Sequence, residues 1–224
     1  MLPKLNKYHN DGLLYKQTHP TFPLTIWNYT PDVQYGEKWD DITLQCRGLV
    51  TDNEGNVVAR PFKKFFNYEE HKPEDLPNET FEVYEKMDGS LGIFFHYNGE
   101  WIMATRGSFT SEQSIKGREL LEKYNFERLH TGYTYLFEII YKENRIVCEY
   151  DYEDIVLLGM IETKSGNEVN IRNNNEDIRF KNMISNIGFR VVMLYKTWGE
   201  GYDLLKEEIP KDKEGYVIRF KNGF

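Results

Sequence analysis

The stretch Lys86-Met87-Asp88-Gly89-Ser90 stands between two strand-like runs, Phe81 to Tyr84 and Leu91 to Tyr97. A lysine amine is a poor nucleophile at its ordinary pKa of about 10.4, whereas burial and nearby cations lower that pKa and free the lone pair. Gly89 lets the backbone turn and lets a phosphate come close to it. A strand lysine followed by an Asp-Gly turn explains the same five residues, so the surrounding sequence has to decide between the two interpretations.

Hairpin patterns lie on both sides of this stretch. The runs Leu91 to Tyr97 and Trp101 to Thr105 flank Asn98-Gly99, a dipeptide whose residues tolerate positive φ and which therefore favours a tight turn. Upstream, Gly48 to Asp52 and Val57 to Phe62 flank the turn at 53–56. The other predicted strands are Tyr133 to Tyr141, Ile155 to Ile161, Val191 to Tyr195 and Tyr216 to Phe220.

Three helices are predicted among these strands. Ser111 is placed to cap a helix that runs to Tyr124, with Ile115, Leu120 and Leu121 on its buried face. A second spans 175–187 before Gly188, and its expected inward residues are Ile178, Met183, Ile184 and Ile187. A third spans 202–208 before Pro210. Hairpins with interspersed helices predict an α+β fold of mostly antiparallel sheets with flanking helices.

The end of the sequence is unusual for such a fold. The strand Tyr216 to Phe220 is followed by a turn-like Lys221-Asn222-Gly223, and the sequence stops at Phe224 before a strand returns. An unpaired strand edge is a liability. We therefore expect residues 1–224 to form one domain that lacks its last strand.

Composition limits the classes of function. The chain of 224 residues carries 28 Lys and Arg against 36 Asp and Glu, a net charge of -8, so any nucleic-acid or nucleotide site must be a local basic cluster. We find no signal peptide and no apolar run long enough to span a membrane. Cys46 and Cys148 show no staple or metal-ligand spacing, which favours reduced thiols and a cytoplasmic protein, in a host cytoplasm if the source is viral.

The pentapeptide at Lys86 matches the Lys-x-Asp-Gly signature of the covalent nucleotidyltransferases, which include DNA ligases, RNA ligases and mRNA capping enzymes. Three further blocks follow in that superfamily's order: Thr105-Arg106-Gly107-Ser108, Tyr135 to Ile140, and Glu214-Gly215-Tyr216-Val217. Each block is weak alone, but their shared order and register strengthen the resemblance.

Three other blocks narrow the resemblance from the superfamily to one family. Cys46 to Val50, Arg60 to Asn67 and Asn144 to Val147 resemble segments of the bacteriophage RNA ligase 1 family of ATP-dependent RNA ligases. The resemblance covers about residues 25–224. It implies that 1–224 is a single nucleotidyltransferase domain, truncated before motif V, whose lysines contact the α-phosphate in the family. The family's C-terminal RNA-specificity domain would be absent.

The resemblance also implies roles for individual residues. Lys86 would be the nucleophile that takes up AMP, Arg47 and Lys64 would contact nucleotide phosphates, and Glu138 would accept a hydrogen bond from a ribose hydroxyl. The other implied nucleotide-binding residues are Phe66 in the pocket wall, Tyr29 stacked on the adenine, Asp88, Gly89, Arg106 in a position that some members fill with lysine, and Glu214, which would lie near the metal.

Ordinary structural roles compete with these assignments. Basic residues such as Arg47 and Lys64 usually belong to a solvated face, and Phe65, Phe66 and Phe137 are more often core than nucleotide contacts. Glu138 is harder to explain in this way, because it interrupts an apolar run and a buried carboxylate without partners is costly.

The implied activity is ATP-dependent RNA end joining through a lysyl-AMP intermediate, with RNA 5′-phosphate and 3′-hydroxyl ends as partners. ATP and Mg²⁺, with Mn²⁺ as an alternative, would be the cofactors, and we expect a monomer that adenylylates slowly without motif V. Two alternatives stay open: a capping-type guanylyltransferase or DNA ligase domain, and a non-catalytic fragment that binds nucleotide or RNA ends.

Overall fold

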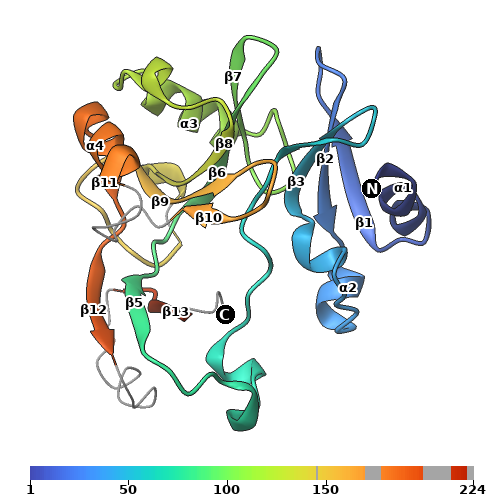
Figure 1. Ribbon diagram of the computed structural model, residues 1–224, viewed down its shortest axis with the longest axis horizontal. Coiled ribbons are helices and arrows are strands. Elements are labelled where there is room, and N and C mark those ends of the chain that lie inside the picture. The colour runs from blue at the N-terminus through green and yellow to red at the C-terminus, as the bar shows by residue number, and fades with distance from the viewer. Residues whose placement is uncertain (145, 170–177, 199–212, 221–224) are drawn as a thin grey trace.

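The computed structural model describes residues 1–144, 146–169, 178–198 and 213–220. Its strands form three sheets (Figure 1). The N-terminal sheet has the order β1 (Leu14–Thr18), β2 (Leu24–Tyr29), β3 (Arg47–Asp52), β4 (Val57–Ala59), all antiparallel. The central sheet runs β10 (Glu168–Val169), β9 (Asp154–Glu162), β8 (Tyr133–Ile140), β6 (Ser90–Tyr97), β7 (Glu100–Ala104). The small sheet is β12 (Leu194–Trp198), β5 (Phe81–Glu85), β13 (Tyr216–Phe220).

Helices cover the outer faces of the two larger sheets. Figure 1 shows α1 (Leu2–Asn10) and α2 (Pro31–Tyr35) beside the N-terminal sheet, and α3 (Glu112–Leu121) and α4 (Ile178–Ile187) along the central one. A short strand, β11 (Arg190–Val191), pairs in parallel with β9. Single 3-10 turns occur at Thr43–Gln45, Tyr68–Glu70, Pro73–Asp75, Phe126–Arg128 and Lys142–Asn144. The predicted α+β class with mostly antiparallel sheets is confirmed.

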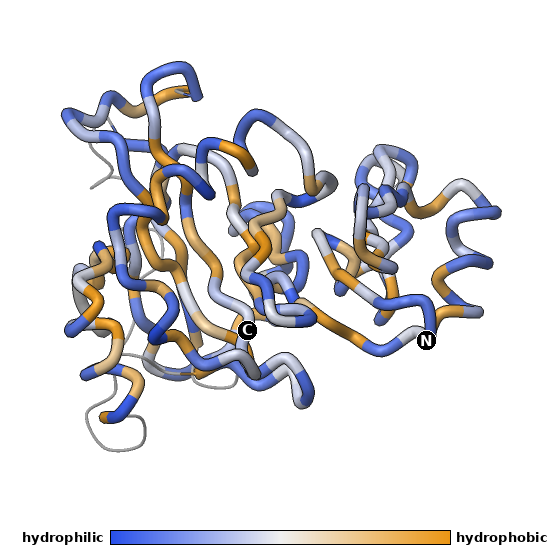
Figure 2. The backbone as a smooth tube through the Cα atoms, turned by 90° about the horizontal axis from the view of Figure 1, so that it is seen from above, coloured by the Kyte–Doolittle hydropathy of each residue, from blue (hydrophilic) through white to orange (hydrophobic). Residues whose placement is uncertain are grey.

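Burial patterns show how the layers pack. Strand β8 sends Tyr135, Phe137 and Ile139 into a core shared with α3 and α4, whereas Leu136 packs in a cluster with β2 and β3. Ile140, on the same side as Leu136, belongs to a third cluster, with Tyr84 of the small sheet. Hydrophobic stretches accordingly follow the strands (Figure 2). The central sheet is therefore covered by helices on one face and by the two other sheets on the opposite face.

The two predicted hairpins are present. Asn98 and Gly99 join β6 to β7 with φ of 48° and 86°, the positive values that the dipeptide predicted. Gly55 turns the chain between β3 and β4 with φ of 87°. The strand predictions around Lys86 are thus confirmed to within one or two residues, except that β4 ends at Ala59 and not at Phe62.

The helix predictions are partly wrong. α3 ends at Leu121, three residues early, and Ile115 is 54% exposed although Leu120 and Leu121 are buried. α4 is described from Ile178, which is 51% exposed and not inward. In α3 the buried face is formed by Ser114, Gly117 and Leu121, so Ile115 points away from the sheet. The third predicted helix, residues 175–177 and the turn at 221–223 lie outside the described residues.

The predicted strand from Val191 to Tyr195 is two strands. The Val192 amide donates to Leu157 of β9 in the central sheet, whereas the Met193 carbonyl accepts from Glu85 of β5 in the small sheet. The chain passes from one sheet to the other between these two residues, so one apolar run serves both. The N-terminal elements α1, β1, β2 and α2 were not predicted.

Candidate functional site

Lys86 lies directly after β5, beside the start of β13. Its backbone amide donates to the Gly215 carbonyl at 3.1 Å, and its ammonium forms an ion pair with the Glu214 carboxylate. The two side chains are 39% and 26% exposed, so the pair is reachable from solvent without being loose in it. Two blocks 128 residues apart in the sequence therefore meet at one place. The sequence predicted cations around the lysine, whereas its ion-pair partner here is a carboxylate.

Glu138 occupies the point where two apolar clusters on the same face of the central sheet meet. It follows Leu136, which packs on the N-terminal sheet, and precedes Ile140, which packs on the small sheet. Burial, and then the Glu214 carboxylate, raise the pKa of the Glu138 carboxyl to about 8, while Arg47 acts in the opposite direction. Lys86 opposes the rise as well, so Glu138 is within electrostatic reach of the lysine pair.

Arg47 begins β3 and is directed toward this place. Burial lowers the pKa of its guanidinium, which Tyr29 and Glu138 oppose and Arg106 reinforces. Its Nε is buried without a hydrogen-bond partner, and so is Oδ1 of Asn28, the residue paired with it on β2. Because a buried donor is costly when unsatisfied, the two orphaned atoms indicate that this end of the N-terminal sheet is arranged for a polar ligand or water.

The side chains of Lys64 and Phe66 contact each other, and Lys64 lies within electrostatic range of Arg47. The Lys64 ammonium lies 4.2 Å from the centre of the Phe66 ring and 5.6 Å from that of Trp39. Burial lowers the pKa of Lys64; Glu70 opposes that change and Arg47 adds to it. Phe66 packs edge-on against Trp39 at 5.5 Å between ring centroids. Phe66 therefore packs against Trp39 and Lys64 is a cation within electrostatic range of Arg47, whereas the contact of both residues with a nucleotide stays a prediction.

Tyr29 and Arg106 meet at the edge of the same region. The Arg106 guanidinium lies 5.6 Å from the centre of the Tyr29 ring, whose edge contacts Trp39 at 4.9 Å. Tyr29 is only 5% exposed, so little of its ring is free; its stacking on adenine stays a prediction. Gly48, with φ of 111°, lets the backbone of Arg106 pass, since a Cβ there would lie 3.2 Å from the Arg106 carbonyl oxygen.

Asp88 binds a distant backbone segment, a structural role that the sequence did not predict. Its Oδ2 accepts backbone hydrogen bonds from Ile146, Val147 and Cys148, at 3.3, 2.5 and 2.6 Å, and its own amide donates to the Tyr150 hydroxyl at 3.0 Å. The carboxylate is 3% exposed. Asp88 thus fastens the 146–148 segment to the turn that carries Lys86.

Gly89 is required because the turn lies close to β8, whereas the sequence predicted the close approach of a phosphate. A Cβ at this position would lie 2.6 Å from the Ile139 carbonyl oxygen and 3.1 Å from the Glu138 side chain. The glycine therefore brings the turn against β8, and so brings Lys86 close to Glu138. Contact of Gly89 with a phosphate stays a prediction.

A cavity of about 440 Å³ lies beside the turn that carries Lys86, although neither Lys86 nor another predicted site residue lines it. Both sequence neighbours of Lys86, Glu85 and Met87, line it, together with the aromatic side chains of Tyr150 and Tyr152 and the Val192 side chain. The Lys213 ammonium reaches Glu85 at its edge, 2.5 Å from Oε1. Aromatic walls with a few charged groups suit a flat, polar-edged ring.

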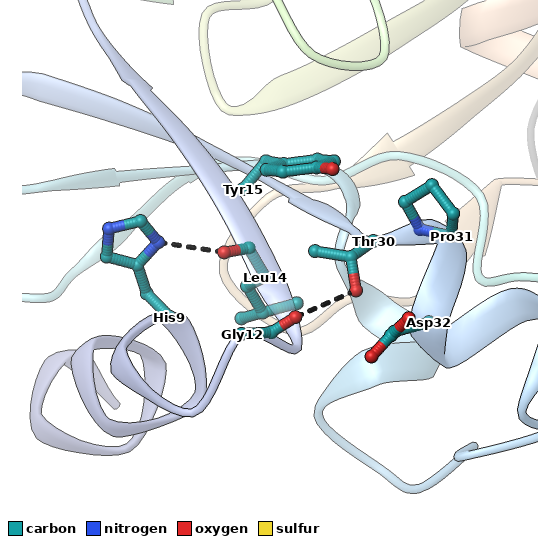
Figure 3. Close-up of a pocket in the computed structure, with 7 residues that line it drawn as sticks. All are labelled: His9, Gly12, Leu14, Tyr15, Thr30, Pro31 and Asp32. Atoms are coloured by element: carbon teal, nitrogen blue, oxygen red, sulfur yellow. Dashed lines mark hydrogen bonds between the residues drawn. The ribbon is translucent and has the colours of Figure 1, made fainter.

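A second cavity, of about 260 Å³, lies in the N-terminal sheet and holds none of the predicted site residues (Figure 3). The Thr30 hydroxyl donates to the Gly12 carbonyl at 3.0 Å, and a His9 ring nitrogen lies 2.8 Å from the Leu14 carbonyl. Because these polar side chains are already bonded to the backbone, the cavity is a weaker candidate than the one beside Lys86.

Carboxylates near Lys86 define where a metal ion could be held. Within the described ranges no group of three or more His, Cys, Asp or Glu has metal-binding geometry. Glu138 and Glu214 do act on each other electrostatically. Magnesium commonly uses one or two carboxylates together with phosphate oxygens, so this pair fits a cation that a phosphate helps to hold.

Sequence analysis missed two residues of this region. Tyr150, which bonds the Asp88 amide, carries no recognisable motif, and only its position after an apolar segment could have singled it out. Phe65 was expected in the core but is 47% exposed. Phe137, expected there as well, is fully buried.

Three mostly antiparallel sheets, a lysine after a strand, a carboxylate from a neighbouring sheet and a nearby group of cations together define the nucleotidyltransferase class of fold. A solved archaeal ATP-dependent RNA ligase has the same fold, with a TM-score of 0.63 and 18% identity, over 97% of this chain and 57% of that one.

The family model described as RNA ligase, of the phage T4 RNA ligase 1 type, matches residues 45–224. The chain belongs to this family, which confirms the resemblance read from the sequence.

Two curated relatives agree with this assignment. The chain is 32% identical to a Thermovibrio ammonificans protein named "Putative RNA ligase", over 78% of this chain and 47% of the relative. It is 35% identical to a protein of Autographa californica nuclear polyhedrosis virus named "Putative bifunctional polynucleotide kinase/RNA ligase", over 49% of this chain and 20% of the relative. The chain thus spans less than half the length of either relative.

Proposed function

We propose that this chain is the nucleotidyltransferase part of an ATP-dependent RNA ligase in which Lys86 takes up AMP. The observation that supports the proposal most strongly is the ion pair of Lys86 with Glu214, with Glu138 and Arg47 within electrostatic range of that pair. A nucleophile, two carboxylates and a cation are the groups that transfer of a nucleotidyl group requires.

The first step is attack of the Lys86 amine on the α-phosphorus of ATP. The nitrogen–phosphorus bond forms while the bond from phosphorus to the pyrophosphate oxygen breaks, and pyrophosphate leaves. The ammonium must first lose a proton, for which its ion-pair partner Glu214 is an acceptor in place. Arg47, Lys64 and Arg106 are the cations available to offset the charge on the phosphate oxygens.

The base of ATP fits the cavity beside Lys86. Its volume of about 440 Å³ and its walls of Tyr150 and Tyr152 suit a purine, and its lining by Glu85 and Met87 supports a position of the base close to the turn that carries Lys86. Glu138 then remains for a ribose hydroxyl, to which a carboxylate oxygen can accept a hydrogen bond.

A divalent cation completes the site. Glu214 would hold it together with phosphate oxygens and water, and Mg²⁺ or Mn²⁺ would polarise the phosphate and help neutralise the leaving pyrophosphate. With either metal ion, Lys86 would form the bond to phosphorus. Glu214 would exchange its ion pair with Lys86 for a contact with the metal ion or with water bound to it.

The later steps extend the proposal to RNA. AMP passes from Lys86 to an RNA 5′-phosphate, and a 3′-hydroxyl displaces it as the strands join. We expect the chain to act as a monomer in the cytoplasm, of a host cell if its source is viral. No helix among the described residues has both the length and the apolar character of a membrane span.

Intact mass spectrometry tests the first step. After incubation with ATP and Mg²⁺ the chain should gain the mass of AMP, and peptide mapping should place it on Lys86. Lys86→Ala should form no adduct, because among the described residues Lys86 is the amine that pairs with Glu214. Lys7→Ala, at an exposed lysine of α1, is the control and should keep the adduct. An adduct that survives in Lys86→Ala contradicts the proposal, and a preference for GTP supports a capping-type enzyme.

A further inference from the structure

Phe65 is exposed where an aromatic ring would ordinarily be buried. It is 47% exposed, whereas its neighbour Phe66 packs against Trp39 at 5.5 Å. Burial alternates between partly buried and exposed along residues 62–67, so Phe65 and Phe66 face opposite sides of one short stretch outside helix and strand. An exposed aromatic ring beside a ligand site is a candidate contact surface.

The Phe65 ring is held in a fixed place. The Arg47 guanidinium lies 5.1 Å from its centre, within the range of a cation–π contact. The Phe65 carbonyl accepts a hydrogen bond from the Lys64 ammonium at 2.5 Å, and the Lys64 amide donates to Leu44 at 2.8 Å. Phe65 therefore presents a positioned ring and not a loosely hanging one.

Positive charge surrounds this ring although the chain as a whole is acidic. Arg47 and Lys64 adjoin it, and the side chain of Lys63 is exposed in the same segment. Arg47 also acts on Glu138, which in turn is acted on by Lys86. The ring thus contacts a cation that lies within electrostatic range of the groups proposed to transfer AMP.

We propose that Phe65 is a stacking platform for the 5′-terminal base of the RNA, with that nucleotide's 5′-phosphate directed toward Arg47. The inference rests on the proposed function. Single-stranded RNA is commonly recognised by stacking its unpaired bases on aromatic rings next to cations that bind the backbone. An RNA end suits this place because the rest of the strand can continue into solvent.

The base of ATP is the competing occupant of the ring. The cavity lined by Tyr150 and Tyr152 is the site proposed above for the base of ATP, whereas Phe65 does not line that cavity and is 47% exposed. An exposed ring suits a ligand that arrives after the nucleotide is covalently attached. Phe65 should therefore affect RNA binding and leave lysyl-AMP formation largely unchanged.

Photo-cross-linking and binding test this assignment on the full chain. A 5′-phosphorylated single-stranded oligoribonucleotide with 5-iodouridine at its first position should cross-link to the peptide that contains Phe65. By fluorescence anisotropy, Phe65→Ala should bind this RNA about tenfold more weakly, as expected for the loss of one stacked base. Phe65→Trp should retain the affinity and the cross-link.

A second aromatic residue serves as the control. Tyr15 is 57% exposed on β1, which β2 separates from β3, and Tyr15→Ala should bind RNA as the unchanged chain does. Equal RNA affinity in Phe65→Ala, a cross-link on another peptide, or no RNA binding by the chain would each overturn the inference. So would an equal loss of lysyl-AMP formation in Phe65→Ala, because the ring would then serve only to position Arg47. Absence of the adduct in the unchanged chain contradicts the proposed function alone, since cross-linking does not need it.

Discussion

Glu138 shows how much one residue depends on its surroundings. Its sequence context, an acidic residue inside an apolar strand, predicted a special role, and the structure places it between two apolar clusters and beside Glu214. Burial raises the pKa of its carboxyl to about 8, well above the value of about 4.3 for an exposed glutamate. A glutamate kept at this cost to stability is typical of a functional site.

This shift predicts a pH dependence of stability. Because the folded-state pKa is raised, the contribution of the Glu138 carboxyl is fully present below about pH 4.3 and is lost as the pH rises through about 8. Glu138→Gln replaces the carboxyl with an amide that does not ionise, so the variant should not lose this stability at high pH. It should raise the free energy of unfolding by roughly 2–5 kcal/mol at about pH 9 and by much less at about pH 5, in urea titrations.

The exposed Glu127 provides the comparison, since Glu127→Gln should change stability little at either pH. A gain for Glu138→Gln that is equal at both values would show that the carboxyl does not titrate differently in the folded chain. The same variant should label more slowly with ATP, because an amide accepts a ribose hydrogen bond more weakly than a carboxylate.

At the scale of elements, the turn after β5 is positioned by contacts with three distant segments. The Lys86 amide is bonded to Gly215 before β13, Gly89 lies against β8, and Asp88 binds 146–148. The central stretch of the sequence is thus the point at which the small and central sheets are joined. Asp88 and Gly89 therefore hold the two sheets together at this turn, in addition to the roles that the family motif implies for them.

Asp88 gives a prediction at this scale. Asp88→Ala leaves three backbone amides at 146–148 without their acceptor and should lower the free energy of unfolding by about 2–4 kcal/mol. Asp88→Asn keeps one oxygen and should cost less. Urea denaturation measures both, with the exposed Asp32→Ala as the control. If Asp88→Ala proves as stable as the control, the carboxylate does not hold this segment.

At the scale of the whole molecule, a single ion pair bridges two sheets. Arg219 of β13 pairs with Glu168 of β10, and its guanidinium lies 5.2 Å from the Phe62 ring and 5.6 Å from the Tyr84 ring. Burial raises the pKa of Glu168, which Arg219 opposes. The pair therefore connects the small sheet to the edge of the central one, across the side on which Lys86 and Glu138 meet.

A double-mutant cycle tests this bridge. Arg219→Met and Glu168→Gln should show a coupling of about 1 kcal/mol in unfolding, because the pair is only partly exposed. Arg219→Met should cost more than Glu168→Gln, since it leaves a partly buried carboxylate unpaired. A cycle with Lys7 and Asp11, an exposed pair, should show less coupling. Additive effects at 219 and 168 would mean that the bridge does not stabilise the packing of the sheets.

The sequence by itself determined the antiparallel α+β class, the hairpins, the position of Lys86 after a strand, and family membership. These follow from local signals, such as the positive φ of Asn98 and Gly99 and the order of short motifs, which need no distant contact. The sequence also indicated that Glu138 has a special role, since an acidic residue in an apolar strand is costly wherever that strand packs.

Only the tertiary structure decided the environments of those residues. That Lys86 pairs with Glu214, that Asp88 fastens 146–148, and that Phe65 is exposed while Phe137 is buried all depend on which segments pack together. Alternation within a strand or periodicity within a helix predicts which residues share a face. It does not predict which element packs on that face. Ile115 and Ile178 were placed wrongly, and the run from Val191 divides between two sheets, because pairing and coverage arise from long-range contacts that local sequence patterns do not specify.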